Sequence, residues 1–383
     1  MNILLACHQS PHDYAIPAYR FWHTYFCEGL REAGHTVLEV PDADWARGLL
    51  ALAPDELRAW QADTWSRALD TARAARAAGG LDLFLGYFYP QQIDGGALRA
   101  IRDLGVPCVN FFCDNVREFR AVPAAYHEFD LHWVPEFAAL ELYRRAGLPH
   151  IHAPMPVWVE PRHRTCEHAE RHGPTFLGSS DSTRLTLLAD AVARGADVTV
   201  RGPAWASAEP SAAPPPAPLA RRLAAQWKFL RDQGAAALLR RHFSRSPTPK
   251  PFPRERVATP VWGDDYIAMT QQSSVVIGIN RFPSFRHPAN RPAAYSRLRD
   301  IEAPMLGACY LTEWAPGLDR LYEPGNEIET YRDAAELAEK LRALQADAPR
   351  RRRLRAAGQR RALAEHTIPR TIRQIAEHLG CTA

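Results

Sequence analysis

Short apolar segments alternate with helical segments along most of this chain, and the alternation restricts the folds open to it more than any other feature. The first cycle has an apolar run at residues 2–7, a helical spacing of apolar residues over 17–31 that ends at Gly34, and a second run at 36–40. A strand, a helix and a strand in this order predict parallel strands joined by a crossover helix. In such sheets the functional loops follow the carboxyl ends of the strands.

The alternation continues in two series, separated by a segment rich in Pro, His and Arg at residues 152–172. In the first series we expect strands at 81–87, 107–112 and 131–134 and helices at 54–78, 96–104 and 135–146. In the second we expect strands at 175–178, 197–201, 274–279 and 308–312 and helices at 182–193, 266–272, 298–305, 334–346, 350–364 and 369–379. Together they predict an α/β protein with two doubly wound, Rossmann-like domains.

The predicted domain limits follow from these two series. The first domain covers residues 1–151, the segment 152–172 is a linker, and the second domain covers 173–365 with an insertion at about 204–260. Residues 366–383 contain a terminal helix, which we expect to pack back on the first domain.

Composition excludes several classes of protein. With 46% hydrophobic and 23% charged residues among 383, the chain can form packed cores, and extensive disorder is excluded. No apolar run approaches the roughly 20 residues of a membrane-spanning helix. A net charge of +4 is too small to indicate a nucleic-acid-binding protein. The seven cysteines include no C-x-x-C pair and no signal-peptide pattern precedes Cys7, so we expect a reducing, cytoplasmic location.

The insertion differs in composition from the rest of the chain. Residues 208–219 are rich in Pro and Ala and predict an unstructured segment, whereas 220–242 are amphipathic and basic. The basic and apolar side chains of this second part are Arg221, Arg222, Lys228, Arg231, Arg240 and Arg241 beside Trp227, Phe229, Leu230 and Leu238. Three roles are open: a flexible lid, a clamp on an anionic acceptor, or peripheral contact of residues 220–256 with an anionic membrane.

A motif in the last third of the chain indicates a particular family and function for the predicted fold. Residues 296–312 read SRLRDIEAPMLGACYLT, and the similarity extends through 317–327 to Tyr331 and 335–337. This stretch resembles the R-x-F-E-x-x-A-x-G-x-x-L-x-T and F-x-P-G-x-E motifs of the CgeB-like (spore-maturation type) glycosyltransferases. The resemblance implies the GT-B architecture, with two Rossmann-like doubly wound domains facing across a cleft. It also implies metal-independent transfer of a sugar from a nucleotide-diphosphate donor to an acceptor hydroxyl.

Several residues suit the binding of such a donor. A carboxylate in the first turn of a helix can accept hydrogen bonds from both ribose hydroxyls, and Glu302 is placed for this. The small residues Gly178, Ser179 and Ser180 lie between a strand and a helix, where backbone N–H groups can bind a diphosphate. Arg184 and Arg299 can neutralise its charge. The alternatives are a plain turn capped by Ser or Asp, a structural ion pair for Arg299, and a surface position for Glu302.

The resemblance adds further donor contacts. Arg201 and Gly202 stand in a turn similar to the family's G-x-x-W, beside the nucleotide base, and Gly263 and Tyr266 match its G-x-x-Y helix start. Asn280 and Arg281 end a strand and are also expected donor contacts. Otherwise these residues only shape loops. Distant relatives of the family carry a second Glu eight residues before the first, but Ala294 stands there in this chain.

The first domain offers candidates for the catalytic base that removes the proton of the acceptor hydroxyl. Asp114 ends a buried strand in a stretch that resembles the P-x-V-x-x-x-x-D of related transferases. His8, His12 and Asp13 lie on the loop after the first strand. The competing interpretation is helix capping for the aspartates and packing for His8.

Other patterns do not point to a cofactor. The D-x-D at 42–44 is attributed to chance, and His163, Cys166, His168 and His172 are not expected to hold a metal. The chain has neither a G-x-G-x-x-G nor a Walker A sequence, so we expect no dinucleotide, no ATP hydrolysis, no metal and no cofactor. Two alternatives remain: a nucleotide-sugar epimerase of the same architecture, and a non-catalytic glycan- or envelope-binding protein.

Overall fold

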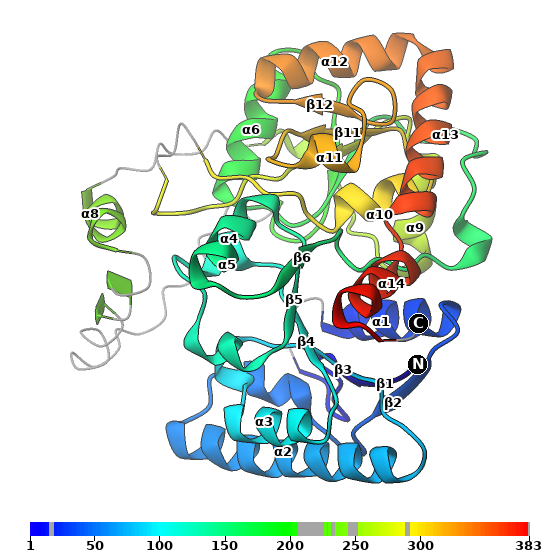
Figure 1. The fold of residues 1–383 in the computed structure, drawn as a ribbon. Coiled ribbons are helices and arrows are strands. Elements are labelled where there is room, and N and C mark those ends of the chain that lie inside the picture. Colours follow the sequence, from blue (N-terminus) through cyan, green and yellow to red (C-terminus); the bar gives the residue numbers. More distant parts are fainter. Residues whose placement is uncertain are drawn as a thin grey trace. The chain divides into compact units, whose positions relative to one another are not determined.

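A computed structural model describes residues 1–14, 19–205, 226–227, 229–230, 234–243, 252–287 and 292–381 (Figure 1). The chain forms two compact units. Unit 1 comprises residues 1–115, 121–158 and 365–383, and unit 2 comprises residues 116–120 and 159–364. Compared with the predicted limits, the second unit begins within the expected linker, and a five-residue stretch after Asn115 belongs to it as well.

Unit 1 contains a parallel six-stranded sheet with the order β2-β1-β3-β4-β5-β6. Its strands are β1 (Asn2–Ala6), β2 (Thr36–Glu39), β3 (Leu83–Tyr87), β4 (Cys108–Phe111), β5 (Leu131–Val134) and β6 (His150–His152). The central strands β3, β4 and β5 are buried along their whole length, as their continuous apolar sequences predict for a sheet covered on both faces.

The helices of unit 1 cover both faces of this sheet (Figure 1). They are α1 (Tyr19–Glu32), α2 (Pro54–Ala77), α3 (Gly95–Asp103), α5 (Leu140–Ala146) and α14 (Ile368–Leu379). The short α4 (Asn115–Glu118) follows β4 and, apart from Asn115, belongs to unit 2. Helices α2 and α3 pack together on one face, and α1 packs against α14 on the other. The approach of α1 to α14 is close, because a Cβ built on Gly29 would lie 2.4 Å from Cδ1 of Ile368.

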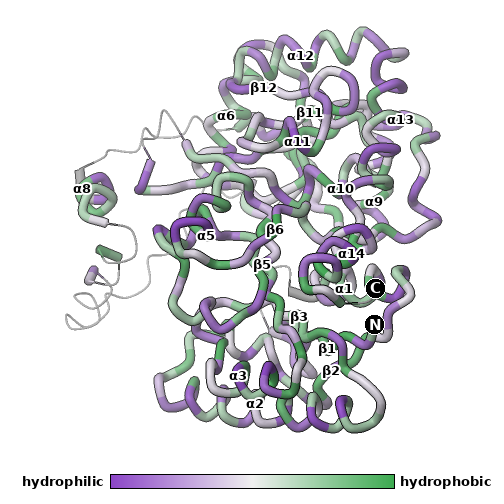
Figure 2. The backbone as a smooth tube through the Cα atoms, viewed as in Figure 1, coloured by the Kyte–Doolittle hydropathy of each residue, from purple (hydrophilic) through white to green (hydrophobic). Residues whose placement is uncertain are grey.

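Unit 2 repeats the plan with a parallel sheet of order β12-β11-β10-β7-β8-β9. Its strands are β7 (Thr175–Leu177), β8 (Thr199–Arg201), β9 (Val257–Ala258), β10 (Val276–Gly278), β11 (Tyr310–Glu313) and β12 (Glu329–Tyr331). Its helices are α6 (Ser182–Ala193), α8 (Ala235–Phe243), α9 (Gly263–Gln272), α10 (Arg299–Met305), α11 (Leu318–Leu321), α12 (Ala334–Ala346) and α13 (Ala348–Glu365). Helices α6 and α12 pack together on one face of the sheet, and α9 and α10 lie on the other (Figure 1). Purple and green alternate along α2 and α12 in Figure 2, as expected of helices with one buried face.

Both sheets reverse their winding direction once. In unit 1 the strand order changes direction between β1 and β3, and in unit 2 between β7 and β10. Ligands of doubly wound folds bind outside the carboxyl ends of the strands at such a switch point. The loops after β1 and β3 and after β7 and β10 are therefore where this fold predicts bound ligands.

The predicted elements agree with the structure apart from a few short ones. The sequence interpretation lacked β6, β9 and β12 and placed a continuous helix at 135–146, where a 3₁₀ turn (Phe137–Ala139) precedes α5. Further 3₁₀ turns lie at Trp45–Leu49, Pro90–Gln92, Ala124–Glu128, Pro161–His163 and Arg254–Arg256. All seven cysteines are free thiols. No helix among the described residues is long and apolar enough to cross a membrane.

The insertion is described only in part. Helix α8 and the short stretches 226–227 and 229–230 are described, whereas the Pro/Ala-rich segment 208–219 and the basic residues Arg221, Arg222, Lys228 and Arg231 lie outside the described residues. The three predicted roles of this segment stay predictions.

Candidate functional site

Two loops of unit 2 lie directly against each other at the carboxyl edge of the sheet. The amide of Gly178 donates to the carbonyl of Arg201 at 2.9 Å, and the indole of Trp205 donates to the carbonyl of Gly178 at 2.7 Å. A Cβ built on Gly202 would lie only 2.1 Å from the carbonyl oxygen of Gly178. A residue without a side chain is therefore required at position 202, and the loops after β7 and β8 pack directly against each other beside the switch point.

The backbone N–H groups that the sequence offers to a diphosphate are mostly occupied. The carboxylate of Asp181 accepts from the amides of Thr183 and Arg184, both at 2.9 Å, and so caps α6. The amide of Ser180 donates to the carbonyl of Pro203 at 3.0 Å. The capping alternative describes this turn correctly, because an Asp side chain occupies the position that an anion would take.

Arginine side chains supply positive charge beside the same turn. Nη1 of Arg184 donates to the carbonyl of Ser179 at 3.0 Å, and Nη1 of Arg299 would lie 3.8 Å from a Cβ built on Gly178. The pKa of Arg184 is lowered, first by burial and then by the nearby charges of Arg297 and Arg299, although Asp181 raises it. Three guanidinium groups therefore share this edge of the sheet, and such an arrangement attracts an anion.

Glu302 lies next to this arginine cluster and not in bulk water. It is 7% exposed, and the hydroxyl of Tyr266 on α9 donates to its Oε2. The guanidinium of Arg299 lies 5.4 Å from the centre of the Tyr266 ring. Burial raises the pKa of Tyr266, so the phenol keeps its proton and orients the carboxylate. Glu302, Tyr266 and Arg299, three of the predicted donor-binding residues, are thus in one group.

Asn280 and Arg281 have partners inside the protein. Nδ2 of Asn280 donates to Oδ2 of Asp300 at 2.9 Å and to the carbonyl of Glu313 at 2.7 Å, and Asn280 is 1% exposed. The Nε of Arg281 donates to the carboxylate of Glu313 at 2.6 Å. Burial raises the pKa of the Asp300 carboxyl. These side chains hold β10, α10 and β11 together, which is the loop-shaping alternative.

Arg201 and Gly263 lie at the rim of unit 2. Nη1 of Arg201 donates to the carbonyl of Thr259 at 3.1 Å, so its guanidinium is directed to the segment after β9. Gly263 opens α9 with a φ of 54°, a backbone angle that favours glycine. The preceding Trp262 is 70% exposed.

In unit 1, His8 lies at the switch point, directly after β1. It adopts a φ of 53°, is 3% exposed, and its ring centre is 4.3 Å from that of Tyr87 at the end of β3. Burial lowers its pKa to about 3, so the imidazole is neutral at physiological pH. Its Nδ1 has no hydrogen-bond partner among the residues that the structure describes.

The other catalytic candidates divide into two groups. Asp114 follows β4 and is half-buried. Burial raises the pKa of the Tyr87 phenol most, and the nearby charge of Asp114 raises it further. The Tyr87 hydroxyl lies 3.0 Å from Sγ of Cys113. His12 and Asp13 are exposed on the loop after β1. His8, Tyr87 and Asp114 therefore share one edge of the sheet.

Two features were absent from the sequence interpretation. Arg297 belongs to the arginine cluster, and its position in the motif of residues 296–312 was a usable signal. A cluster of His23, Cys27 and Glu39 also lies outside every motif. Among the described residues it is the one group of three such side chains close enough to hold a metal ion, and it does not involve His163, Cys166, His168 or His172.

Solved structures share the fold over the whole chain. A sucrose-phosphate synthase from Thermosynechococcus elongatus is 14% identical with a TM-score of 0.56, over 99% of this chain and 98% of that one. HepE from Anabaena, solved in complex with UDP, is 13% identical with a TM-score of 0.53, over 99% of both chains. AviGT4, a glycosyltransferase involved in avilamycin A biosynthesis, is 14% identical with a TM-score of 0.53, over 98% and 96%. The fold is that of the GT-B glycosyltransferases.

A family model places the chain more narrowly. The model described as "Glycosyl transferase-like" matches residues 184–377, slightly more than half of the chain, and the protein belongs to that family. No curated protein matches the sequence.

Proposed function

We propose that the protein is a GT-B glycosyltransferase of the CgeB-like type. In this proposal it transfers a sugar from a nucleotide-diphosphate donor to an acceptor hydroxyl without a catalytic metal ion. The observation that carries the proposal is the position of Arg299 beside the Glu302–Tyr266 pair. The charges of Arg297 and Arg299 in turn act on Arg184. An anion-binding group and a buried carboxylate then meet at the switch point of unit 2, where a doubly wound fold binds its ligand.

Each part of the site corresponds to one part of a nucleotide sugar. The Glu302 carboxylate accepts hydrogen bonds from the vicinal hydroxyls of the ribose, and the Tyr266 hydroxyl fixes its orientation. The arginines bind the diphosphate, which the backbone amides of α6 cannot do because Asp181 caps them. Structures of HepE with UDP, with UDP-glucose, and with UDP and glucose support a nucleotide-sugar donor for this fold.

The chemistry follows from the charges. The bond between the anomeric carbon and the diphosphate oxygen breaks, and negative charge develops on the leaving nucleoside diphosphate. Guanidinium groups fixed beside that oxygen stabilise this charge in the role that a metal ion has in other enzymes. The acceptor hydroxyl attacks the anomeric carbon and loses its proton to a base.

For the base we assign Asp114, with His8 as its neighbour on the same sheet edge. The pKa of His8, lowered to about 3 by burial, makes this imidazole a weak base at neutral pH. A neutral imidazole with an unpartnered Nδ1 suits a hydrogen bond to the acceptor hydroxyl. Unit 1 would thus hold the acceptor, and unit 2 the donor.

A donor screen followed by a transfer assay tests this function. Nucleoside diphosphates and their sugars should raise the thermal unfolding temperature of the full chain, and the best donor should then be turned over with release of its nucleoside diphosphate. Arg299→Met should weaken binding about 10- to 100-fold, the range expected for loss of a hydrogen bond to a charged group. Arg353→Met, at an exposed position on α13, is the matched control.

Three results would contradict the proposal. The first is the absence of any thermal shift with the whole panel of nucleotides. The second is conversion of the donor sugar into an epimer in the absence of acceptor. The third, a transfer reaction that requires added Mg²⁺ or Mn²⁺, would contradict metal independence alone.

A further inference from the structure

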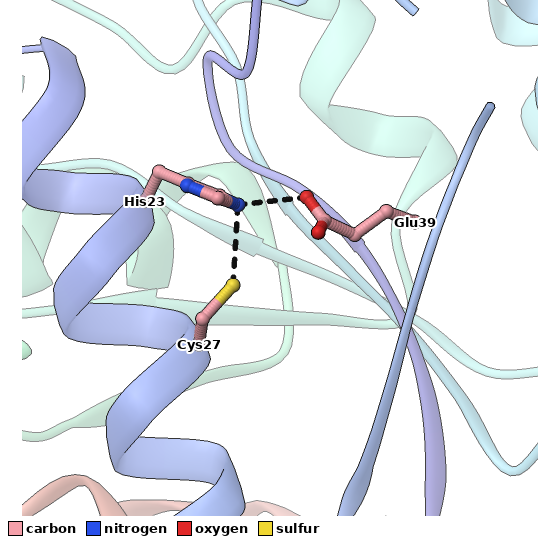
Figure 3. Close-up of side chains that lie close together, drawn as sticks. All are labelled: His23, Cys27 and Glu39. Atoms are coloured by element: carbon pink, nitrogen blue, oxygen red, sulfur yellow. Dashed lines mark hydrogen bonds and ion pairs between the residues drawn. The ribbon is translucent and has the colours of Figure 1, made fainter. Parts of the chain in front are cut away.

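Three side chains of different chemistry converge at the edge of the sheet in unit 1. His23 and Cys27 lie one turn apart on α1, and Glu39 is the last residue of β2 (Figure 3). Sγ of Cys27 is 3.2 Å and Oε1 of Glu39 is 2.7 Å from the same nitrogen, Nε2 of His23. The ligand atoms of all three lie within 4.8 Å of one another.

A single imidazole nitrogen cannot satisfy both neighbours well. Nε2 carries either one hydrogen or one lone pair, whereas a sulfur and a carboxylate oxygen both approach it. A cation at the centre of the group would instead take one lone pair from each of the three atoms. Thiolate, imidazole and carboxylate form the mixed set that Zn²⁺ accepts, and Mg²⁺ and Ca²⁺ require oxygen ligands.

Two of the three distances between ligand atoms are within roughly 0.6 Å of those in tetrahedral zinc coordination. The third, between Sγ of Cys27 and the Glu39 carboxylate, is at most 4.8 Å and has to shorten. Bonds of about 2.0–2.3 Å to zinc place neighbouring ligand atoms about 3.3–3.6 Å apart. The sulfur–nitrogen distance of 3.2 Å is already near this value. The oxygen–nitrogen distance of 2.7 Å has to open by roughly 0.6 Å. The Glu39 side chain is 37% exposed at a strand end and can move that far.

The surroundings also have the form of a metal site. Nε2 of Gln9 donates to Oε1 of Glu39 at 3.0 Å and to the carbonyl of Leu5 at 2.9 Å, so a further residue orients one ligand. Cys27 is buried at 3% exposure, whereas the His23 side chain is 34% exposed. The group is therefore closed on the protein side and open to solvent on the other, where water can complete the coordination.

We propose that His23, Cys27 and Glu39 bind one zinc-class divalent cation with a water molecule as the fourth ligand. On binding, the Cys27 thiol releases its proton to solvent, and so does His23, whose Nε2 carries a hydrogen in its ion pair with Glu39. The thiolate and the carboxylate then neutralise the charge of the ion. The ion links α1 to β2 next to the loop that carries His8. The site takes no part in the proposed transfer reaction, so a test of zinc binding does not depend on the proposed function.

Metal content and cobalt spectroscopy of the untagged full chain test the proposal. After equilibration with zinc and desalting, the parent should retain about one zinc per chain, and cobalt should give a thiolate-to-metal charge-transfer band. Cys27→Ser should remove that band, and His23→Ala and Glu39→Gln should each weaken zinc binding at least about tenfold. Zinc should raise the thermal unfolding temperature of the parent and not that of Cys27→Ser.

Cys166→Ser combined with His168→Ala is the matched control, since both residues lie in the other His- and Cys-containing segment. This double variant should bind zinc like the parent. A parent that retains less than about one tenth of an equivalent would overturn the proposal. So would a Cys27→Ser variant with an unchanged cobalt band, or loss of zinc only in the double variant.

Discussion

Acidification should destabilise unit 1 through a histidine buried among aromatic rings. His132 on β5 is 1% exposed, and its ring centre lies 4.9 Å from that of Tyr143 and 5.7 Å from that of Tyr126. Burial lowers its pKa from the usual 6.5 to about 3. The folded chain therefore holds this imidazole neutral at pH values where the unfolded chain protonates it.

The sign and size of the effect follow from linkage. Between pH 6.5 and pH 3 the unfolded state binds more protons at this residue, so the free energy of unfolding falls as the pH is lowered. At about pH 4.5 the solution is about two units below the ordinary histidine pKa, which corresponds to a loss of about 2.7 kcal/mol relative to neutral pH. The stability contributed by the neutral imidazole is complete above the unfolded-state pKa.

His132→Phe tests this reasoning because it keeps a ring in the same place and removes the proton-binding group. Urea titrations at about pH 7.5 and about pH 4.5 give the pH-dependent loss for each protein, so any change at neutral pH cancels. The variant should lose about 2–3 kcal/mol less than the parent on acidification. His127→Gln, at an exposed neighbouring histidine, should behave like the parent. Equal losses in the parent and in His132→Phe would refute the argument.

Three further substitutions test the packing and charge of unit 2. Gly202→Ala should lower the free energy of unfolding in a urea titration by about 1–3 kcal/mol, because the new Cβ would lie 2.1 Å from a backbone oxygen. A Cβ at Gly173 meets nothing within 4 Å, so Gly173→Ala should leave this free energy unchanged. Arg355→Met should lower the free energy of unfolding by about 3 kcal/mol or more, because the 2% exposed guanidinium donates to the carbonyls of Gln271, Gly307 and Ser273. An unchanged melting temperature would contradict this. Asp181→Ala should lower the free energy of unfolding by about 1 kcal/mol, because α6 loses its N-terminal cap. The same variant should bind pyrophosphate more strongly in calorimetry, and weaker binding would show that the arginines are not the anion site.

The repeated alternation of strands and helices was sufficient to predict the architecture. Most strands and helices of both sheets were predicted because their apolar spacing is regular. The missed strands β9 and β12 have two and three residues, too few for any periodicity to appear. Strand β6 lies at the edge of the first sheet and contains two histidines, a composition that indicates no strand.

Part of the candidate site could be predicted, and part depends on tertiary contacts. Glu302 and Arg299 stand in a recognisable motif, but the pairing of Glu302 with Tyr266 requires that α9 and α10 meet across 36 positions of sequence. The occupation of the helix N-terminus by Asp181 was a stated alternative, and only geometry decides between a cap and an anion. His23 and Glu39 converge because α1 packs beside β2, which no local pattern encodes.

Calorimetry with ribose and deoxyribose nucleotides tests the assigned role of Glu302 most directly. The nucleoside diphosphate that binds best is compared with its 2′-deoxy form on the parent, on Glu302→Gln, and on Glu339→Gln, an exposed control on α12. The parent and the control should prefer the ribose form about 10-fold or more, because the deoxy form loses a hydrogen bond to a charged group. Glu302→Gln should bind both forms weakly and nearly alike. A variant that keeps the parent's affinity and preference would contradict the assignment of Glu302 to the donor ribose.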